Sequence, residues 1–355
     1  MKHLRILFVG QMVAGSRVLQ RIKAMKDLGH NVTEVSTSLP GASYEDTPTT
    51  MERISYRLRR PLDKGKANQK ILKLLNSSDF DIAWIEMANT IRAKTLRWVR
   101  LKSPDIKLIW YSEDDMMNPL HRSIFTEYCV PLFDLWVTTK SFNARPGEID
   151  SLGAKRVLFI NNSYDPDIHR PPITSHNILN DYISDVTFIG TYEKPRSKSI
   201  HHLAANGIKV RVWGNGWESI ANAHPNIRVE GRPVYDNEYA MAVIASKINL
   251  CFLRKSNRDV QTCRSIEIPA IGGFMLHERS DEICDIFEER VAADYFSSDE
   301  ELLNKIRFWL QNSVERQKVA YNGHGIIVSG NYRHQDRIET VIKKVMSEVG
   351  DESSG

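Results

Sequence analysis

The residues best suited to chemistry lie in one stretch of the sequence, residues 254–267, RKSNRDVQTCRSIE. Two acids, Asp259 and Glu267, stand within it. The basic residues of the stretch surround them: Arg254, Lys255, Arg258 and Arg264. A carboxylate can accept hydrogen bonds from both hydroxyls of a ribose, and arginines can hold a diphosphate. The stretch therefore indicates a ligand with hydroxyls and phosphates, with a simple ion pair from Arg264 to Glu267 as the alternative.

The position of Glu267 makes this reading sharper. It opens an otherwise apolar segment, IEIPAIGGFML, that is expected to be buried. A carboxylate is costly in such a place unless a partner or a ligand uses it. Ser265, beside it, is a further candidate contact of the same ligand.

A second basic group begins the second half of the chain, in GTYEKPRSKS (190–199). Lys194, Arg196 and Lys198 fall where a helix is expected to start, and cations there oppose the helix dipole. Basic side chains beside free helix amides form a good diphosphate site, so Arg196 and Lys198 are candidate ligand contacts. The alternative is solvated surface charge.

Glycines mark two loops at expected strand ends. GQMVAGSR (10–17) resembles the phosphate loop GxxxxGK[ST], but Ser16 and Arg17 stand where the lysine should be, which argues against a nucleoside triphosphatase. Gly10 is a candidate for lining a ligand site, with a plain tight turn as the alternative. In VWGNGWES (212–219), Gly214 and Asn215 are expected to approach the ligand closely, with a simple turn as the alternative. Val234 is a further candidate contact of the same ligand.

Three consecutive acids, Glu113, Asp114 and Asp115, follow the expected strand IKLIW. They would lie at the carboxyl end of that strand, where open α/β sheets bind ligands. Clustered carboxylates can act as a base or bind sugar hydroxyls, and the alternative is a helix N-cap. No second acidic or histidine cluster completes a metal site, so none is expected.

The elements that must position these residues alternate between strand and helix. LRILFVG, a helix over residues 16–30 and NVTEVST give the strand–helix–strand unit of a parallel sheet. The pattern continues to KRVLFINNSYDP. It restarts at DVTFIGTY after a polar, proline-containing segment, 169–184, interpreted as the linker. Later elements are GFMLHE, a strand, and two final helices. The sequence thus predicts two similar α/β halves.

Composition limits the alternatives. The 355 residues exceed one ordinary core, and a net charge of +4 suits an anionic small ligand better than nucleic acid or a membrane. Four scattered cysteines indicate reduced thiols of a cytosolic protein. The first apolar run is too short for a signal peptide, and none reaches the length of a membrane span. The basic stretch 53–70 could face an acidic acceptor or a membrane surface, or be solvated.

The second half resembles a known family. FLRKSNRDVQTCRSIEIPAIGGFMLHE, followed by IFEERVAADYFSSDEELLNKIRFWLQNSVERQKVAYNG, is similar to group 1 glycosyltransferases of the GT-B fold, most of all to the CgeB-like, spore-maturation branch. The resemblance covers residues 185–340 well. The first half matches in outline, at its first loop and at GAKRVLFINNSYDPDIHRPP. The resemblance of the second half implies that Glu267 binds the nucleotide ribose, and that Arg196 or Lys198 binds the diphosphate. Asp259, one methylene shorter than the family's glutamate, would face the donor sugar.

The resemblance and the residues together predict an α/β protein of the GT-B fold, with two Rossmann-like, doubly wound parallel-sheet domains facing across a cleft. Residues 1–174 would form the acceptor side and 175–340 the nucleotide-sugar domain. Residues 341–355 would be a helix end and a disordered tail. The expected function is cytoplasmic, metal-independent transfer of a sugar from a UDP-, dTDP- or GDP-sugar.

The acceptor is left open and could be a glycan, a protein, a small molecule or a nucleic acid. A nucleic acid is expected only as an acceptor. No cofactor beyond the donor substrate is expected. If the reaction inverts configuration, Asp114 or Asp115 is the candidate base. The alternatives are a non-catalytic protein that binds sugar nucleotides or polyanions on the same fold, and a sugar-nucleotide epimerase.

Overall fold

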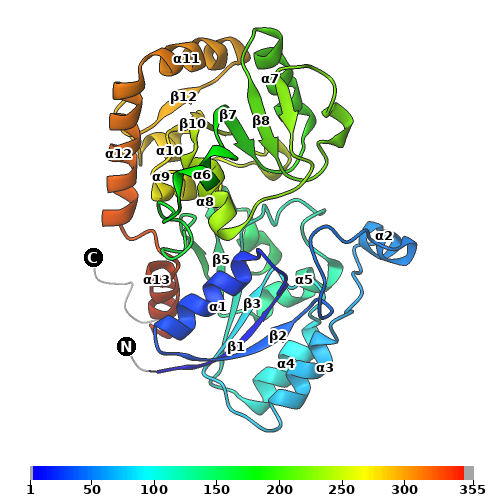
Figure 1. Ribbon diagram of the computed structural model, residues 1–355. Helices are drawn as coiled ribbons and strands as arrows, with labels where there is room; N and C mark the ends of the chain where they lie inside the picture. Colours follow the sequence, from blue (N-terminus) through cyan, green and yellow to red (C-terminus); the bar gives the residue numbers. More distant parts are fainter. Residues whose placement is uncertain (1–2, 348–355) are drawn as a thin grey trace. The chain divides into compact units, whose positions relative to one another are not determined.

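The computed structural model describes residues 3–347, and the expected disordered tail, GDESSG (350–355), lies outside them. The chain divides into two compact units. Unit 1 contains residues up to Asn161 and those from His334, and unit 2 is Asn162–Arg333. Each is built on one six-stranded parallel sheet, as the sequence predicts (Figure 1). None of the helices in the described range is both long and apolar enough to cross a membrane.

The sheet of unit 1 has the strand order β2-β1-β3-β4-β5-β6. Its strands are β1 (Arg5–Gly10), β2 (Asn31–Ser36), β3 (Ile82–Glu86), β4 (Lys107–Ser112), β5 (Leu135–Thr138) and β6 (Val157–Phe159). Its α-helices are α1 (Arg17–Asp27), α2 (Thr50–Arg57), α3 (Ala67–Leu74), α4 (Ala93–Lys102), α5 (Ile124–Cys129) and α13 (His334–Met346). Three short 3₁₀ turns lie at 130–132, 141–144 and 149–152.

Strand β1 shows why this sheet is buried on both faces. Ile6 and Phe8 pack in one cluster with residues of α1 and α13, whereas Leu7 and Val9 pack in another with residues of α3 and α4. Successive strand residues point to opposite faces, so a continuous apolar run is required where helices cover both. Helices α1 and α13 lie side by side on the first face (Figure 1).

The sheet of unit 2 has the order β12-β11-β10-β7-β8-β9. Its strands are β7 (Ser184–Ile189), β8 (Val210–Trp213), β9 (Ile227–Val229), β10 (Ser246–Cys251), β11 (Met275–Glu278) and β12 (Asp294–Phe296). Its α-helices are α6 (His176–Asn180), α7 (Lys194–Ala205), α8 (Asp236–Ile244), α9 (Arg264–Ile271), α10 (Asp281–Cys284), α11 (Asp299–Gln311) and α12 (Ser313–Ser329). Two 3₁₀ turns lie at 218–220 and 255–257.

The two faces of this second sheet carry separate cores. One cluster joins Phe188 of β7 to α7 and α11, and the other joins Cys251 of β10 to α8 and α9. Helix α7 follows β7 after a short turn, and α9 follows β10 after the loop 252–263, so the first turns of both lie toward the carboxyl edge of the sheet. That edge is where open parallel sheets bind ligands.

The limits of the units differ from those expected from the sequence. Residues 162–174 belong with unit 2, ahead of the expected boundary at 174/175, and α13 belongs with unit 1. Strands β9 and β12 were not predicted, and three long helices, not two, follow the last strand. Of the four cysteines, Cys129, Cys251 and Cys263 are buried thiols, and Cys284 is half-buried.

Candidate functional site

Two arginines meet at the carboxyl edge of the sheet in unit 2. The Cζ atoms of Arg196 (α7) and Arg264 (α9) lie 5.5 Å and 5.7 Å from the ring centroid of Phe188. Arg196 is 5% exposed; it donates to the carbonyl of Thr191 (3.0 Å), and its Nε lies 3.1 Å from Glu193. The Nε atoms of both arginines are nevertheless buried without a hydrogen-bond partner. The edge thus keeps unused cationic donors.

The charges of these two arginines oppose each other. Burial, followed by the positive charge of Arg264, lowers the pKa of Arg196 to about 10. Like charges with unused donors are held together at a cost to the fold. An anion with several oxygens, such as a diphosphate, would satisfy both groups.

Lys198 lies apart from this arginine pair. It is exposed, and it follows Arg196 by two residues, which is a rotation of about 200° around an α-helix. The two candidate cations therefore point to opposite sides of α7. Of the two, Arg196 is the one that the structure brings to Arg264.

Glu267 lies in the first turn of α9 and is 6% exposed. Its Oε1 lies 3.8 Å from Nε2 of His169. Nδ1 of His169 accepts from the backbone N–H of Asp165 (3.0 Å), so a neutral imidazole carries its proton on Nε2, toward the carboxylate. Tyr239 packs edge-on against His169, and burial, then the Glu267 carboxylate, raises the pKa of Tyr239. Glu267 thus sits among polar groups inside an apolar unit.

The alternative reading of Glu267 as the ion-pair partner of Arg264 does not hold for these two described residues, because no ion pair joins them. They are instead neighbours three positions apart on the first turn of α9. One turn of α-helix rises about 5.4 Å. Arg264, which could bind a phosphate, and Glu267, which could bind hydroxyls, therefore lie side by side on α9.

Ser265 and Asp259 have structural partners. Ser265 is 0% exposed, and its hydroxyl lies 2.7 Å from Nε2 of His277 and accepts from the N–H of Thr262 (3.0 Å). Its side chain therefore holds the start of α9, and a contact of Ser265 with a ligand stays a prediction. Asp259, half-buried, accepts from Asn257 Nδ2 (2.8 Å) and closes the loop before α9.

The glycine loop after β8 is explained by close backbone packing. Gly214 has φ +128°, and a Cβ there would lie 2.2 Å from the carbonyl O of Gly190. The carbonyl of Asn215 accepts from Tyr192 N (2.9 Å). Val234 is buried in the core cluster of α8 and α9. The close approach predicted at Gly214 is thus made to the turn after β7, which it helps to fix beside the arginines.

The corresponding edge of unit 1 is also rich in charge, but its charges are paired. Arg21 is buried, and its guanidinium donates to Glu86 and to Glu113 (2.9 Å). Arg17 donates to the other oxygen of Glu113 (2.9 Å). Burial opposes ionisation of Glu113, but Arg17 and Arg21 outweigh it and hold the pKa of that carboxyl far below its usual range. Glu113 is therefore a counter-ion.

The two candidate bases differ in environment. Asp115 is 2% exposed, and its Oδ1 accepts from Asn143 Nδ2 (2.9 Å) and Met117 N (3.0 Å). It fixes the loop. Asp114 is half-buried, and its backbone is held by the Ser112 hydroxyl.

Gly10, the last residue of β1, is a packing position. A Cβ there would lie 3.2 Å from the side chains of Phe8 and Val18. Its turn leads into α1, whose N-cap, Ser16, accepts from Val18 N (3.1 Å). The glycine is thus accounted for by space between strand and helix.

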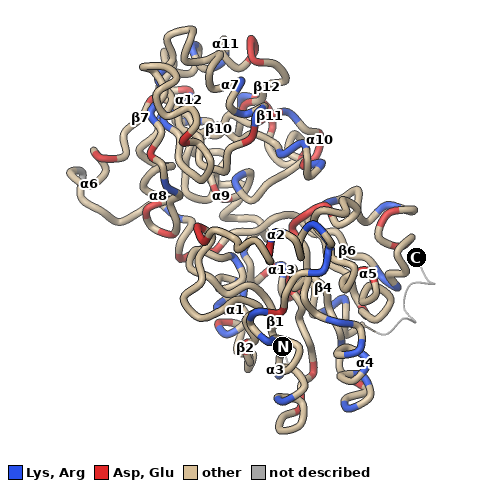
Figure 2. The backbone as a smooth tube through the Cα atoms, turned by 90° about the vertical axis from the view of Figure 1, so that its right-hand side faces the viewer, with Lys and Arg blue, Asp and Glu red and all other residues tan. Residues whose placement is uncertain are grey.

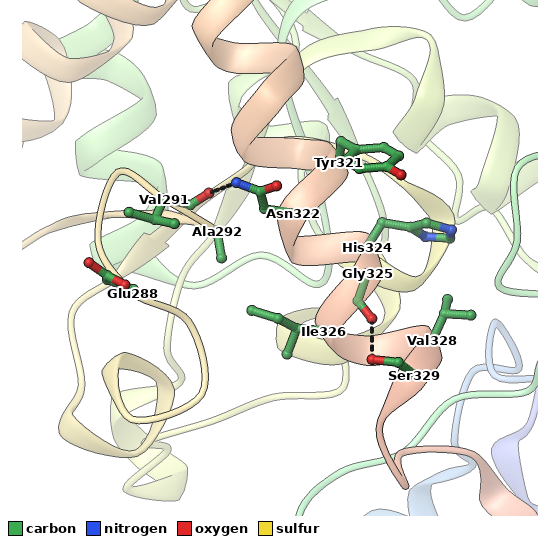
Figure 3. A pocket seen from close by; sticks show the side chains of 10 residues that line it. All are labelled: Glu288, Val291, Ala292, Tyr321, Asn322, His324, Gly325, Ile326, Val328 and Ser329. Atoms are coloured by element: carbon green, nitrogen blue, oxygen red, sulfur yellow. Dashed lines mark hydrogen bonds between the residues drawn. The ribbon is translucent and has the colours of Figure 1, made fainter.

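Two cavities of unit 2 complete the description. A cavity of about 90 Å³ is lined in part by Arg196, Lys255 and Glu278, and is smaller than the roughly 300–1,000 Å³ of usual ligand pockets. A second, of about 580 Å³, lies between α12 and the turn at 288–292 (Figure 3). Its walls include Tyr321 and His324 and none of the predicted site residues.

His169 is the site residue that sequence reasoning missed. It was assigned to the linker because the segment 169–184 is polar and contains prolines. The signal was present in DPDIH (165–169). The backbone N–H of Asp165 donates to the ring of His169, and the backbone N–H of His169 donates to the carbonyl of Asp165. Tyr239 was also missed, because it lies in a largely apolar helix.

Comparisons with known proteins agree with this architecture. Residues 196–343 match a family model described as Glycosyl transferase-like, and no curated protein matches significantly. The chain is similar to the structure of Anabaena Alr3699/HepE in complex with UDP-glucose, with 12% identity, 96% of this chain and 100% of that chain covered, and a TM-score of 0.65. It is also similar to sucrose-phosphate synthase from Thermosynechococcus elongatus, with 10% identity, 96% and 99% coverage, and a TM-score of 0.66.

A third similar structure is a Listeria monocytogenes protein assigned as a UDP-N-acetylglucosamine 2-epimerase, with 11% identity, 97% and 96% coverage, and a TM-score of 0.56. The fold is therefore GT-B, as predicted, with two parallel six-stranded sheets. The family match over residues 196–343 is to the glycosyltransferase class. Since an epimerase shares the fold, the choice between transfer and epimerisation depends on the site.

Proposed function

We propose that the protein is a glycosyltransferase that uses a nucleotide-diphospho sugar, with a UDP-, dTDP- or GDP-sugar as the donor. One observation carries the proposal. Arg264 and Glu267 stand on one turn of α9, with Arg196 beside the first and His169 beside the second. A nucleoside diphosphate carries its phosphates next to its ribose, and this turn offers cations next to a hydroxyl acceptor.

The arginine pair also supplies a catalytic role. When the bond from the sugar to the diphosphate breaks, negative charge grows on the leaving oxygens. Fixed guanidinium groups with unused donors stabilise that charge more than the ground state, which lowers the barrier. We keep Asp259 as a candidate contact of the donor sugar, although its loop already uses both carboxylate oxygens, through Arg254 N (3.3 Å) and Asn257 Nδ2 (2.8 Å).

For an inverting reaction we propose Asp114 as the base and Asp115 as the residue that shapes its loop, because Asp115 is buried and hydrogen-bonded. Asp114→Asn should then lower turnover by ~10²–10⁴-fold and leave donor affinity intact. Product configuration by NMR and turnover are measured together. An inverted product made by Asp114→Asn at the wild-type rate would remove the residue from catalysis.

Within the class, the similarity of residues 185–340 to the CgeB-like branch supports placement there. The acceptor is not specified by the site. Independence from metal and a cytoplasmic location remain predictions. A screen of acceptors is less informative at first than a screen of donors, because the residues proposed to bind the donor are the ones with defined geometry.

The test is a thermal-shift panel of nucleotide sugars, followed by product analysis. A donor at 100 times its dissociation constant should stabilise the protein by about 2.7 kcal/mol. Slow release of nucleoside diphosphate from that donor, without an acceptor, supports a transferase. Conversion of the sugar to its epimer would instead show an epimerase. Stabilisation with neither reaction, in the presence of an acceptor panel, would favour a binding protein.

A further inference from the structure

Helix α2 of unit 1 exposes an apolar stripe. Met51, Ile54 and Leu58 are 68%, 56% and 60% exposed. Their spacing of three and four residues places them on one side of the helix. Within α2 itself, Ser55 is the buried residue. The stripe therefore contributes nothing to the core of the unit.

The N-terminus of α2 is stabilised by its own capping residues and not by burial of the apolar stripe. Thr49 and Glu52 form a capping box, in which each side chain satisfies the backbone N–H of the other residue. Glu52 is further held by Lys64. Figure 1 shows α2 standing out from the sheet and the other helices of unit 1. An ordered, projecting helix with three large apolar side chains in water is typical of an interaction surface.

The charge beside the stripe is positive. Residues 50–60 contain four arginines and one glutamate. The glutamate is neutralised by Lys64, and Arg59 is paired with Glu127. Arg53, Arg57 and Arg60 are exposed and take part in none of the ion pairs of the described residues. The acids Glu45 and Asp46 precede the helix and hydrogen-bond to Ser43. Figure 2 marks Lys and Arg in blue along the backbone, including the segment at α2.

We propose that α2 binds the surface of a membrane that contains anionic lipids. Met51, Ile54 and Leu58 would enter the boundary between headgroups and acyl chains, and the three arginines would lie against lipid phosphates. Nucleic acid would use the arginines but leave the apolar stripe in water, so a lipid surface fits better. The proposal does not depend on the donor site.

The test is flotation of the full chain with vesicles of phosphatidylcholine alone or mixed with phosphatidylglycerol. The wild type should float with the mixed vesicles only, and added salt should release it. Ile54→Gln with Leu58→Gln should weaken binding tenfold or more, on the order of the burial of one large apolar side chain. Leu101→Gln is the matched control, because Leu101 is a 76% exposed leucine of α4 between basic residues. It should bind as the wild type does.

A charge variant tests the second half of the proposal. Arg53→Gln, Arg57→Gln and Arg60→Gln together should weaken binding, by about fivefold for each arginine, and reduce its dependence on salt. Circular dichroism and the melting temperature of all variants should match the wild type, because these side chains are exposed.

Three results would overturn the proposal. The wild type could fail to float with anionic vesicles, or the Ile54/Leu58 variant could float as well as the wild type. In the third, light scattering without lipid would show that the wild type is a dimer and that the same variant is a monomer, so that a second copy covers the stripe. None of these results would touch donor binding, which is measured separately on unit 2.

Discussion

Each sheet presents two arginines at its carboxyl edge, but the two pairs have different partners. In unit 1, Arg17 and Arg21 are bound by Glu113, and Arg21 also by Glu86. In unit 2, Arg264 makes no ion pair within the described chain, and Arg196 pairs with Glu193 but keeps a buried Nε without a hydrogen bond. An arginine at this edge is thus structural where its counter-charges are part of the fold. Where they are absent, as at Arg264, we propose that the guanidinium binds a ligand.

The largest effect is expected from removal of a paired arginine. Arg21→Met should destabilise the protein by about 3–5 kcal/mol, because it leaves Glu86 buried without its counter-ion. Urea unfolding measures the change. Arg17→Met is the control: Arg17 is partly exposed, so its loss should cost at most about 1 kcal/mol. Equal losses would mean that burial is not what separates the two residues.

Removal of an unpaired arginine should act on binding. Arg264→Met should weaken nucleoside diphosphate affinity by about 2–5 kcal/mol, the usual cost of losing a buried charge partner. Its unfolding free energy should fall less than that of Arg21→Met, because the change relieves the repulsion with Arg196 while it removes the attraction of Tyr239 and Glu267 that helps to raise the pKa of Arg264. Calorimetry with the nucleoside alone should show little change, and Lys198→Met, on the far side of α7, should behave as the wild type. A destabilised Arg264→Met with normal affinity would erase the contrast between the two edges.

The acid beside the unpaired arginine should show a smaller effect. Glu267→Gln should weaken binding of a ribonucleotide by about 1.5–3 kcal/mol, because a neutral amide accepts hydrogen bonds less strongly than a carboxylate. If the donor is a UDP- or GDP-sugar, the wild type should prefer its ribonucleoside diphosphate to the 2′-deoxy form, and the variant should lose most of that preference. If the preference survives intact, Glu267 does not contact the ribose.

The sequence predicted those features that depend on local pattern. Apolar runs such as ILFV and LIWY are long enough to mark buried parallel strands, and the charges around Glu267 are close in the chain. Strands β9 and β12 have three residues each, too few to show a period, and were missed. His169 was missed because its partner, Glu267, lies far away in sequence, and only folding brings them to 3.8 Å.

The charges of the acidic loop could be located but not assigned. Glu113, Asp114 and Asp115 look equivalent in the sequence, yet each has a different neighbour: two arginines, a serine hydroxyl and an asparagine amide. Those partners lie up to 96 residues away. The type of residue therefore predicts a polar edge, and tertiary contacts decide which member is a counter-ion.

Helix α13 is made by the ribosome only after all of unit 2. Its apolar residues Ile338, Val341, Ile342 and Val345 complete the core face shared with α1. During synthesis, that face of the first sheet therefore stays open to water while residues 162–333 emerge and fold. Unit 2 can fold as a continuous segment, but unit 1 has to wait for its own last helix. A nascent chain stalled before His334 would present an apolar surface to chaperones.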